Sequence, residues 1–270
     1  MQKKDARSSE SVSGIKHPAF REAERLTRPV SRRETGRYLV EDIQLVRQAL
    51  ATPHARVDAV FCLPAEANAL APCCTARAVP LYVLGNGLLQ KLVGTGYETA
   101  VTAIAIIVQN VVAPQSLLAP DSLILCGERI QDPRNVGVLI RTAEALGCTG
   151  LLLCTDSAEP FRRDAVRSTT GSILRLPLAL TENLPAALTA LRQGGACLIA
   201  SSGQSSTYAT EQDLSVRPLV LIVGNEQSGI TDAVAAISDA IVKLPMHPQS
   251  GADSLNVTVA AGMLLYEAIR

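Results

Sequence analysis

The second half of the chain alternates short apolar runs with segments whose apolar residues recur at helical spacing. Continuous apolar runs such as LILC and LVLIV are typical of parallel strands that are covered on both faces. We expect strands at residues 123–126, 150–154, 196–200, 218–223 and 240–244. We expect helices at residues 136–146, 162–168, 184–193, 231–237 and 255–269. This order predicts an open parallel α/β sheet, in which ligands bind beyond the carboxyl ends of the strands.

The first half shows a similar alternation on a smaller scale. We expect helices at residues 19–29, within 32–50, at 64–74 and at 88–93, and strands at residues 57–62, 80–84 and 103–108. A stretch with two prolines and little periodicity, residues 112–121, favours a domain boundary. The sequence therefore predicts a smaller N-terminal α/β domain over residues 1–115, with a flexible basic tail, and a second domain over residues 116–270.

Composition excludes several classes of protein. The seven cysteines include no C-x-x-C pair, which favours a reduced compartment over a disulfide framework, and with three histidines we expect no metal site. No apolar run reaches the roughly 18 residues of a membrane span. The polar N-terminus lacks the apolar core of a secretory signal. We therefore expect a cytoplasmic protein without a membrane partner.

The formal net charge is zero, but the charges are unevenly distributed. Residues 1–37 contain ten Lys or Arg and five Asp or Glu, which leaves an excess of five positive charges. Such an excess is what a phosphate-binding surface needs. A solvated helix face of mixed charge explains the same pattern equally well, so the charge pattern leaves both interpretations open.

Polar residues follow three of the predicted strands of the second half. Asn135 stands where the helix after the first of these strands should begin, and Arg141 lies nearly two turns further along. A tight polar loop at residues 224–229 follows the strand at 218–223. In the third segment, Asp253 or Ser254 is predicted to cap the last helix. No dinucleotide fingerprint, P-loop or nucleophile elbow is present.

Taken together, these segments resemble one family. NVGVLIRTA at residues 135–143, GNEQSG at 224–229, and LPM at 244–246 followed by SLNV at 254–257 stand in the order and spacing of the SpoU/TrmH family of RNA ribose 2′-O-methyltransferases, within the SPOUT superfamily. The resemblance covers roughly residues 120–270. The segment at residues 166–171 is similar to the family's intermediate region. Residues 32–41 are similar to a substrate-binding domain with a ribosomal-protein RNA-binding fold.

The resemblance implies a trefoil-knotted C-terminal domain that binds S-adenosylmethionine, acts on RNA and assembles as a homodimer. It implies that the cofactor is bound by Gly224, Asn225, Leu244, Met246 and Leu255. The catalytic residues that it implies are Arg141, Asn135, Glu226, Ser254 and Asn256. Arg141 matches the family's catalytic arginine. Because a guanidinium stays charged at neutral pH, we favour phosphate binding and stabilisation of the developing alkoxide, with base action as the alternative.

One loop departs from the family pattern. Members commonly have Met-x-Gly with a serine about six residues after the methionine. Here His247 and Pro248 follow Met246, and Ser254 lies eight residues on. The loop is thus two residues longer, and we expect the pocket to differ at this edge.

The N-terminal domain favours large-subunit ribosomal RNA as the substrate, because tRNA-modifying relatives often lack such a domain. Three alternatives remain: tRNA ribose methylation, an antibiotic-resistance rRNA methyltransferase, and a catalytically silent RNA-binding relative. With 3% aromatic residues and no Trp, extensive base stacking is not expected. Recognition should depend on RNA shape and phosphate.

Overall fold

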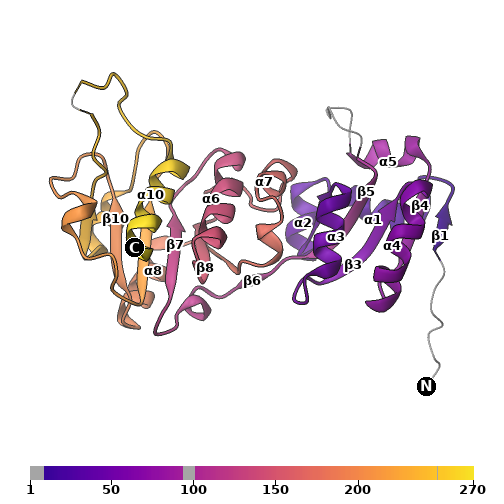
Figure 1. Ribbon diagram of the computed structural model, residues 1–270, viewed down its shortest axis with the longest axis horizontal. Coiled ribbons are helices and arrows are strands. Elements are labelled where there is room, and N and C mark those ends of the chain that lie inside the picture. Colours follow the sequence, from indigo (N-terminus) through magenta and orange to yellow (C-terminus); the bar gives the residue numbers. More distant parts are fainter. Residues whose placement is uncertain (1–8, 94–100, 248) are drawn as a thin grey trace. The chain divides into compact units, whose positions relative to one another are not determined.

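The computed structural model describes residues 9–93, 101–247 and 249–270 (Figure 1). The chain divides into two compact units, and each is described by itself. Unit 1 comprises Met1–Gln109 with Phe161–Arg175, and unit 2 comprises Asn110–Pro160 with Leu176–Arg270. The predicted boundary at residue 115 lies close to the end of the first stretch, but residues 161–175 were predicted to belong to the second domain. Pro248 and residues 1–8 of the predicted tail lie outside the described residues.

In the described part of unit 1, five strands form a mixed sheet with the order β1-β4-β3-β5-β2. Strands β1, β4 and β3 run parallel, and β5 is antiparallel to both β3 and β2. The strands are β1 (Glu10–Val12), β2 (Arg37–Glu41), β3 (Val57–Cys62), β4 (Leu81–Leu84) and β5 (Ala103–Val108). The helices are α1 (Pro18–Arg25), α2 (Pro29–Thr35), α3 (Ile43–Ala51), α4 (Pro64–Ala76), α5 (Asn86–Val93), α7 (Arg163–Ser168) and the short η2 (Ser172–Leu174).

The helix expected within residues 32–50 is confirmed as α3, whereas helix α2 and strand β2, which precede it, were not predicted. Gly36 ends α2 in the left-handed conformation, with φ of 61°. Strand β2 then pairs antiparallel with β5 and buries Tyr38 and Val40. Asp42 starts α3 by accepting a hydrogen bond from the Gln44 N–H. Pairing with β5 defines the strand, and the helical spacing of the sequence begins after it, within α3.

Unit 2 contains an all-parallel seven-stranded sheet with the order β12-β10-β11-β7-β8-β9-β6. The strands are β6 (Val111–Val112), β7 (Leu123–Gly127), β8 (Gly150–Cys154), β9 (Leu178–Thr181), β10 (Cys197–Ser201), β11 (Leu219–Val223) and β12 (Ala240–Val242). The helices are α6 (Pro133–Ala145), α8 (Leu184–Gln193), α9 (Asp232–Ile237) and α10 (Val257–Ile269), with η1 (Pro114–Leu117) and η3 (Ala209–Glu211). The predicted parallel α/β sheet is confirmed; β6 and β9 were not predicted.

Helices cover both faces of this sheet. Every second residue of the strands, for example Ile124, Cys126 and Ile222, joins a buried cluster with Leu188 and Leu191 of α8. Helices α6 and α10 pack against each other, α6 also contacts β8, and α10 also contacts β11. The carboxyl ends of β7, β11 and β12 therefore share one edge, and each is followed by a polar loop. Among the described residues, no helix has the length and apolar character needed to cross a membrane.

Candidate active site

Three polar side chains from distant segments meet in unit 2. The Asn135 Nδ2 group, on α6, donates to Glu226 Oε1 at 2.9 Å. The Asn256 Nδ2 group, at the start of α10, donates to Asn135 Oδ1 at 3.3 Å. Glu226 belongs to the loop that follows β11. The structure thus links three of the residues that the sequence singled out, one from each motif.

Glu226 anchors this network. Its carboxylate also accepts hydrogen bonds from the backbone N–H groups of Gln131 at 3.0 Å and Asp132 at 3.2 Å. Partial burial acts to raise the pKa of the Glu226 carboxyl, but the hydrogen bonds from Asn135, Gln131 and Asp132 outweigh it and lower the pKa from its ordinary value. The group is therefore a carboxylate at neutral pH.

The charge of Glu226 orients its neighbours. An ionised carboxylate only accepts hydrogen bonds, so the Asn135 amide must turn its NH₂ group toward Glu226. The Asn135 carbonyl oxygen then faces the Asn256 NH₂ group. The Asn256 carbonyl oxygen is taken by the Thr258 N–H at 2.8 Å and the Thr258 hydroxyl at 2.6 Å. The orientations of both amides thus follow from one negative charge.

The helix caps differ from those predicted. Asp132, not Asn135, caps α6 by accepting from the Arg134 N–H at 2.7 Å, with Pro133 as the first helical residue. Asn256, rather than Asp253 or Ser254, caps α10. Asp132 followed by Pro133 is a helix-start signal in the sequence, and it marks the start of α6 more closely than Asn135 does. Asn135 therefore lies within the first turn of α6, where its side chain is available to Glu226.

The loop at residues 224–229 is tightly closed. The backbones of Asn225 and Gly229 exchange two hydrogen bonds of 3.0 Å, and Asn225 Oδ1 accepts from the Ser228 N–H at 2.9 Å. A Cβ atom on Gly224 would collide with the backbone of Gly229 and Ile230. Gly224 and Asn225 therefore shape the loop that presents Glu226, and their predicted contact with a cofactor is a separate proposal.

Two residues to which the sequence analysis gave no role brace these loops. Buried Glu128 accepts from the Thr231 N–H at 2.9 Å and the Thr231 hydroxyl at 2.7 Å. Arg129, with φ of 53°, donates through Nη2 to Ser228 Oγ at 3.1 Å. The sequence signal that could have identified Glu128 and Arg129 is their position directly after the buried strand β7. Both tie the loop after β7 to the loop after β11.

Arg141 and Ser254 stand outside the network. Arg141 is exposed on α6 and forms no hydrogen bond or ion pair with any residue in the described part of the chain. Its charge is therefore available to an external anion. Ser254 is also exposed, and its side chain makes no hydrogen bond within the described residues.

The predicted apolar contacts to the cofactor are partly uncovered. Met246 is 37% exposed and Leu255 is 36% exposed, while Leu244, two residues beyond β12, is half-buried. Exposed apolar side chains next to polar loops are typical of a ligand surface. Over the described ranges, no three His, Cys, Asp or Glu side chains gather as a metal-binding set.

A sequence model described as the SpoU rRNA Methylase family matches residues 122–266. An uncharacterized tRNA/rRNA methyltransferase of Synechocystis sp. is 32% identical over 262 residues, which cover 96% of this chain and 93% of that protein. The 23S rRNA (guanosine(2553)-2′-O)-methyltransferase RlmP of Bacillus subtilis is 27% identical, over 94% of this chain and 97% of its own length.

Among solved structures, the AdoMet-bound rRNA methyltransferase from Sinorhizobium meliloti is similar to this chain with a TM-score of 0.85 and 26% identity. The match covers 96% of this chain and 97% of that one. Both units are therefore included in the similarity, and not only the part that carries the three motifs.

Proposed function

Because this chain belongs to the SpoU rRNA Methylase family, we propose that it methylates a ribose 2′-hydroxyl of large-subunit ribosomal RNA. It is an RNA methyltransferase that uses S-adenosylmethionine. The observation that carries the proposal is the hydrogen-bonded chain of Glu226, Asn135 and Asn256, which joins the three motifs at one sheet edge. The similarity to a 23S rRNA 2′-O-methyltransferase over 94% of the chain favours the large-subunit substrate.

The residues present suit S-adenosylmethionine. The cofactor supplies an electrophilic methyl group on a positively charged sulfur. The uncovered side chains of Met246 and Leu255, with Leu244, offer apolar contact to an adenosine. The backbone of Gly224 and Asn225 would complete that surface, and the Glu226 carboxylate supplies a negative charge in the same site as a cationic cofactor.

Arg141 would act on the RNA. Its guanidinium is always charged and presents several donors, which suits a phosphate next to the reacting ribose. The same charge would stabilise the alkoxide that develops as the 2′-hydroxyl loses its proton. Since Arg141 is exposed and has no partner among the described residues, these interactions would not require it to break an existing ion pair.

Asn135, Asn256 and Ser254 would position the substrate. Glu226 fixes the orientation of both amides, so any donor or acceptor that they present to a ribose is held in place before the RNA arrives. Ser254 lies two residues before the α10 cap, and its hydroxyl is available to a ligand. A trefoil knot in this domain and a cytoplasmic location belong to the same proposal.

An apolar stripe on α10 supports the proposed homodimer. Val259, Met263 and Tyr266 are 49%, 40% and 57% exposed, and their spacing of four and three residues places them on one helix face. A second copy of the chain would cover this face. The double substitution M263K/Y266K should shift the protein to a monomer in sedimentation velocity, whereas V216K, an exposed apolar residue outside α10, should not. An unchanged oligomer in the double variant would count against this interface.

The substitution R141A tests the catalytic assignment. We expect the rate of methyl transfer to ribosomal RNA to fall by about 10²–10³, the usual effect of removing one group that stabilises a developing oxyanion. Calorimetry should show S-adenosylmethionine affinity within about 0.5 kcal/mol of the parent. R192A removes an exposed arginine of α8 that pairs with Asp239 and was given no role in the site, and it serves as the control. Full activity of R141A would refute the role.

Mapping 2′-O-methyl groups in total RNA, with and without the gene, tests the substrate. One position of the large-subunit RNA should lose its methyl group when the gene is absent. Loss of a methyl group from a tRNA instead would keep the reaction and overturn the proposed substrate.

A further inference from the structure

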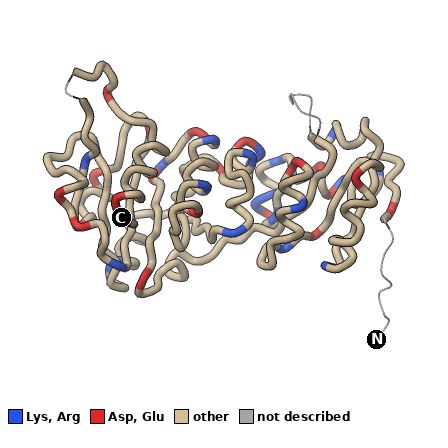
Figure 2. The backbone as a smooth tube through the Cα atoms, viewed as in Figure 1, with Lys and Arg blue, Asp and Glu red and all other residues tan. Residues whose placement is uncertain are grey.

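A cleft of about 480 Å³ lies in unit 1 between α1 and α2, whereas the three motifs described above belong to unit 2. Lys and Arg positions are interspersed with Asp and Glu positions along the backbone of this unit (Figure 2). The ion pairs show which of the charges that line the cleft are already compensated within the protein. Among the residues that the structure describes, the wall of the cleft contains four cations, Lys16, Arg21, Arg25 and Arg37, and two carboxylates, Glu22 and Glu34.

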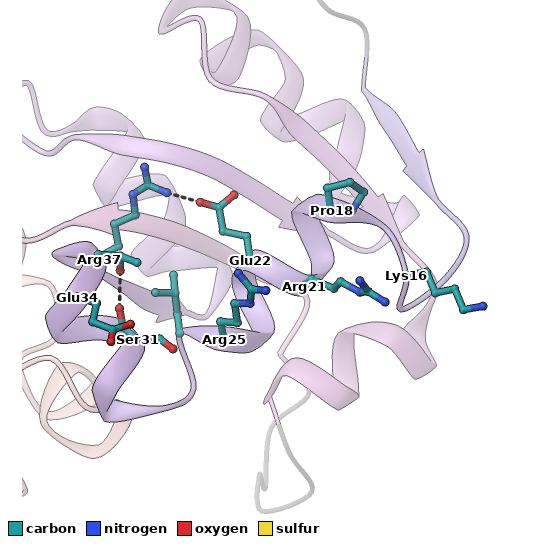
Figure 3. A pocket seen from close by; sticks show the side chains of 10 residues that line it. Lys16, Pro18, Arg21, Glu22, Arg25, Ser31, Glu34 and Arg37 are labelled. Atoms are coloured by element: carbon teal, nitrogen blue, oxygen red, sulfur yellow. Dashed lines mark hydrogen bonds and ion pairs between the residues drawn. The ribbon is translucent and has the colours of Figure 1, made fainter.

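Three of the four cations are free to meet a ligand. Lys16, Arg21 and Arg25 are exposed, and none forms a hydrogen bond or ion pair through its side chain with the described residues. Arg21 and Arg25 are four residues apart on α1, so they share one helix face. In the view of Figure 3, the labelled cations follow one another along the cleft from Arg37 through Arg25 and Arg21 to Lys16.

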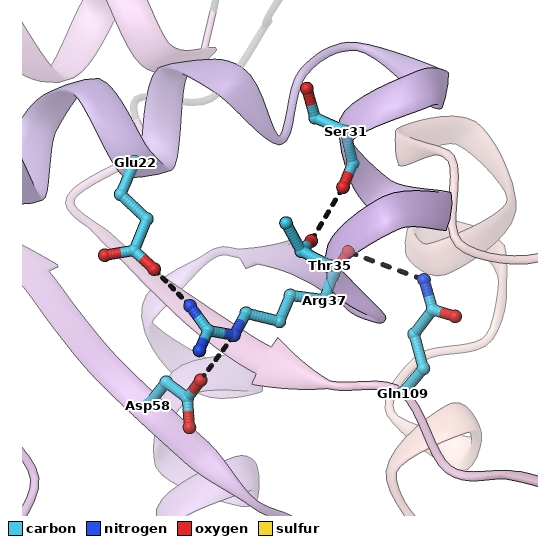
Figure 4. Close-up of polar contacts among 6 residues, drawn as sticks. All are labelled: Glu22, Ser31, Thr35, Arg37, Asp58 and Gln109. Atoms are coloured by element: carbon cyan, nitrogen blue, oxygen red, sulfur yellow. Dashed lines mark hydrogen bonds and ion pairs between the residues drawn. The ribbon is translucent and has the colours of Figure 1, made fainter.

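The fourth cation, Arg37, is engaged in ion pairs within unit 1. Arg37 forms ion pairs with Glu22 and, through Nε at 2.8 Å, with Asp58 (Figure 4). The negative charge of Glu22 is thus compensated within the protein. Glu34 is the remaining carboxylate of the cleft; it is exposed, and its side chain has no partner among the described residues. Three free cations therefore face a single free carboxylate.

The rest of the cleft wall offers little to a nucleobase. None of the described residues that line it is aromatic, so the cleft provides no ring on which a base could stack. The Thr35 hydroxyl donates to the Ser31 carbonyl at 2.7 Å and is thereby engaged within α2. Apart from the Glu34 carboxylate and the Ser31 hydroxyl, the polar side-chain groups that remain are positive charges with N–H donors. Such groups suit phosphate oxygens and read no sequence.

We propose that this cleft binds the phosphodiester backbone of the RNA substrate, through Lys16, Arg21 and Arg25. The inference rests on the proposed function, because that function supplies RNA as the partner. It adds the surface of unit 1 that contacts the RNA and the part of the RNA that is contacted. Glu34 weakens this binding through its negative charge.

The substitution E34Q gives a test that misfolding cannot imitate. Removing the free carboxylate should tighten binding of the full-length protein to protein-free 23S ribosomal RNA by about two- to fivefold, the size of an exposed charge interaction. E24Q makes the same charge change on α1, at a residue that does not line the cleft, and should leave the Kd unchanged. Equal effects of the two variants, or no effect of E34Q, would overturn the proposal.

The double variant R21A/R25A tests the cations directly. Between about 50 and 200 mM salt, the slope of log K against log salt should become shallower by about 1.4 to 1.8, as expected for two lost phosphate contacts. R47A/K91A removes two exposed charges of unit 1 outside the cleft and should change the slope by less than half as much. A slope equal to the parent's in R21A/R25A would refute the assignment.

Competition by inorganic phosphate tests whether the cleft binds a chain of phosphates or a single one. At constant ionic strength, inorganic phosphate should not displace the RNA; displacement would indicate a single-phosphate site and overturn the backbone interpretation. The binding measurements need no cofactor. If the parent protein failed to bind S-adenosylmethionine while R21A/R25A lost RNA affinity, the proposed function would fail and the cleft assignment would stand.

Discussion

At the scale of single residues, the site depends on side chains that are held by fixed hydrogen-bond partners. Glu226 is the clearest case, since one carboxylate receives an amide N–H and two backbone N–H groups from a segment more than 90 positions earlier in the chain. Those hydrogen bonds lower the pKa of the Glu226 carboxyl, because they stabilise its ionised form. Stability and site geometry are therefore linked at this position.

The substitution E226Q should make the free energy of unfolding less dependent on pH. Because the folded-state pKa of Glu226 is lowered, its stabilising contribution is present above the unfolded value of about 4.3 and is lost as the pH falls through the lower folded-state value. The difference in unfolding free energy between parent and E226Q should thus be constant near pH 7 and shrink below about pH 4.3. Urea titrations from pH 3 to 7 measure it. A difference that does not change with pH would contradict this interpretation.

The sequence predicted the members of the site better than their contacts. Asn135, Glu226 and Asn256 were singled out by motif spacing, and the structure brings them together. Their hydrogen bonds join residues 91 and 121 positions apart, a separation at which local patterns carry no information. The caps were misassigned for a related reason: several polar residues stood near each helix start, and only the backbone geometry selects one of them.

At the scale of elements, the long apolar runs were informative and the short ones were not. Strands of unit 2 such as β11 were recognised because both of their faces are buried, which gives continuous runs such as LVLIV, whereas the shorter β6 and β9 were not. Strand β2 has five residues and lies between two helices, and its short apolar run was not recognised as a strand. Its identity comes from pairing with β5, which is more than 60 residues away.

Arg77, at the C-terminus of α4, contacts the end of α3 and provides a test at the scale of elements. Its guanidinium donates to the carbonyls of Ala49, Leu50, Thr52 and Ala55 at 2.6 to 3.1 Å, around the C-terminus of α3. R77A should lower the free energy of unfolding by about 1–3 kcal/mol, because carbonyls that are now paired would lose their donor. R47A, with an ion pair of 3.9 Å on the surface of α3, should cost less than about 0.5 kcal/mol. Chemical denaturation compares them, and equal losses would refute the capping role.

For the molecule as a whole, the two units are not two consecutive stretches of the chain, because each is built from two separate stretches. Phe161–Arg175 lies inside the region that the family model matches, yet it packs as part of unit 1. The Phe161 ring lies 5.1 Å from that of Tyr38, and α7 contacts β2. A boundary predicted from the sequence assumes that each domain is one continuous stretch, so it cannot assign residues 161–175 to unit 1. Deleting the N-terminal residues would therefore remove the packing partner of a retained segment, and point substitutions are the sounder experiment.

The ion pair between Arg163 and Glu41 makes this arrangement measurable. Arg163 Nε donates to Glu41 Oε1 at 2.6 Å, and Nη2 donates to the Leu92 carbonyl at 2.9 Å. The Glu41 side chain is only 4% exposed and that of Arg163 is 34% exposed. R163A should therefore destabilise unit 1 by about 2–4 kcal/mol, somewhat less than the loss of a fully buried pair.

Hydrogen exchange locates the effect of R163A. Amides of β2 and α5 should lose protection, although the substitution lies more than 100 residues away from β2 in the sequence, whereas amides of β10 in unit 2 should exchange as in the parent. The neighbouring Arg162 is the matched control, since it pairs with Asp164 on the surface at 3.0 Å, and R162A should change stability by no more than about 0.5 kcal/mol. If R162A and R163A were equally mild, or if β10 lost protection instead of β2, the segment would not stabilise unit 1 through this contact.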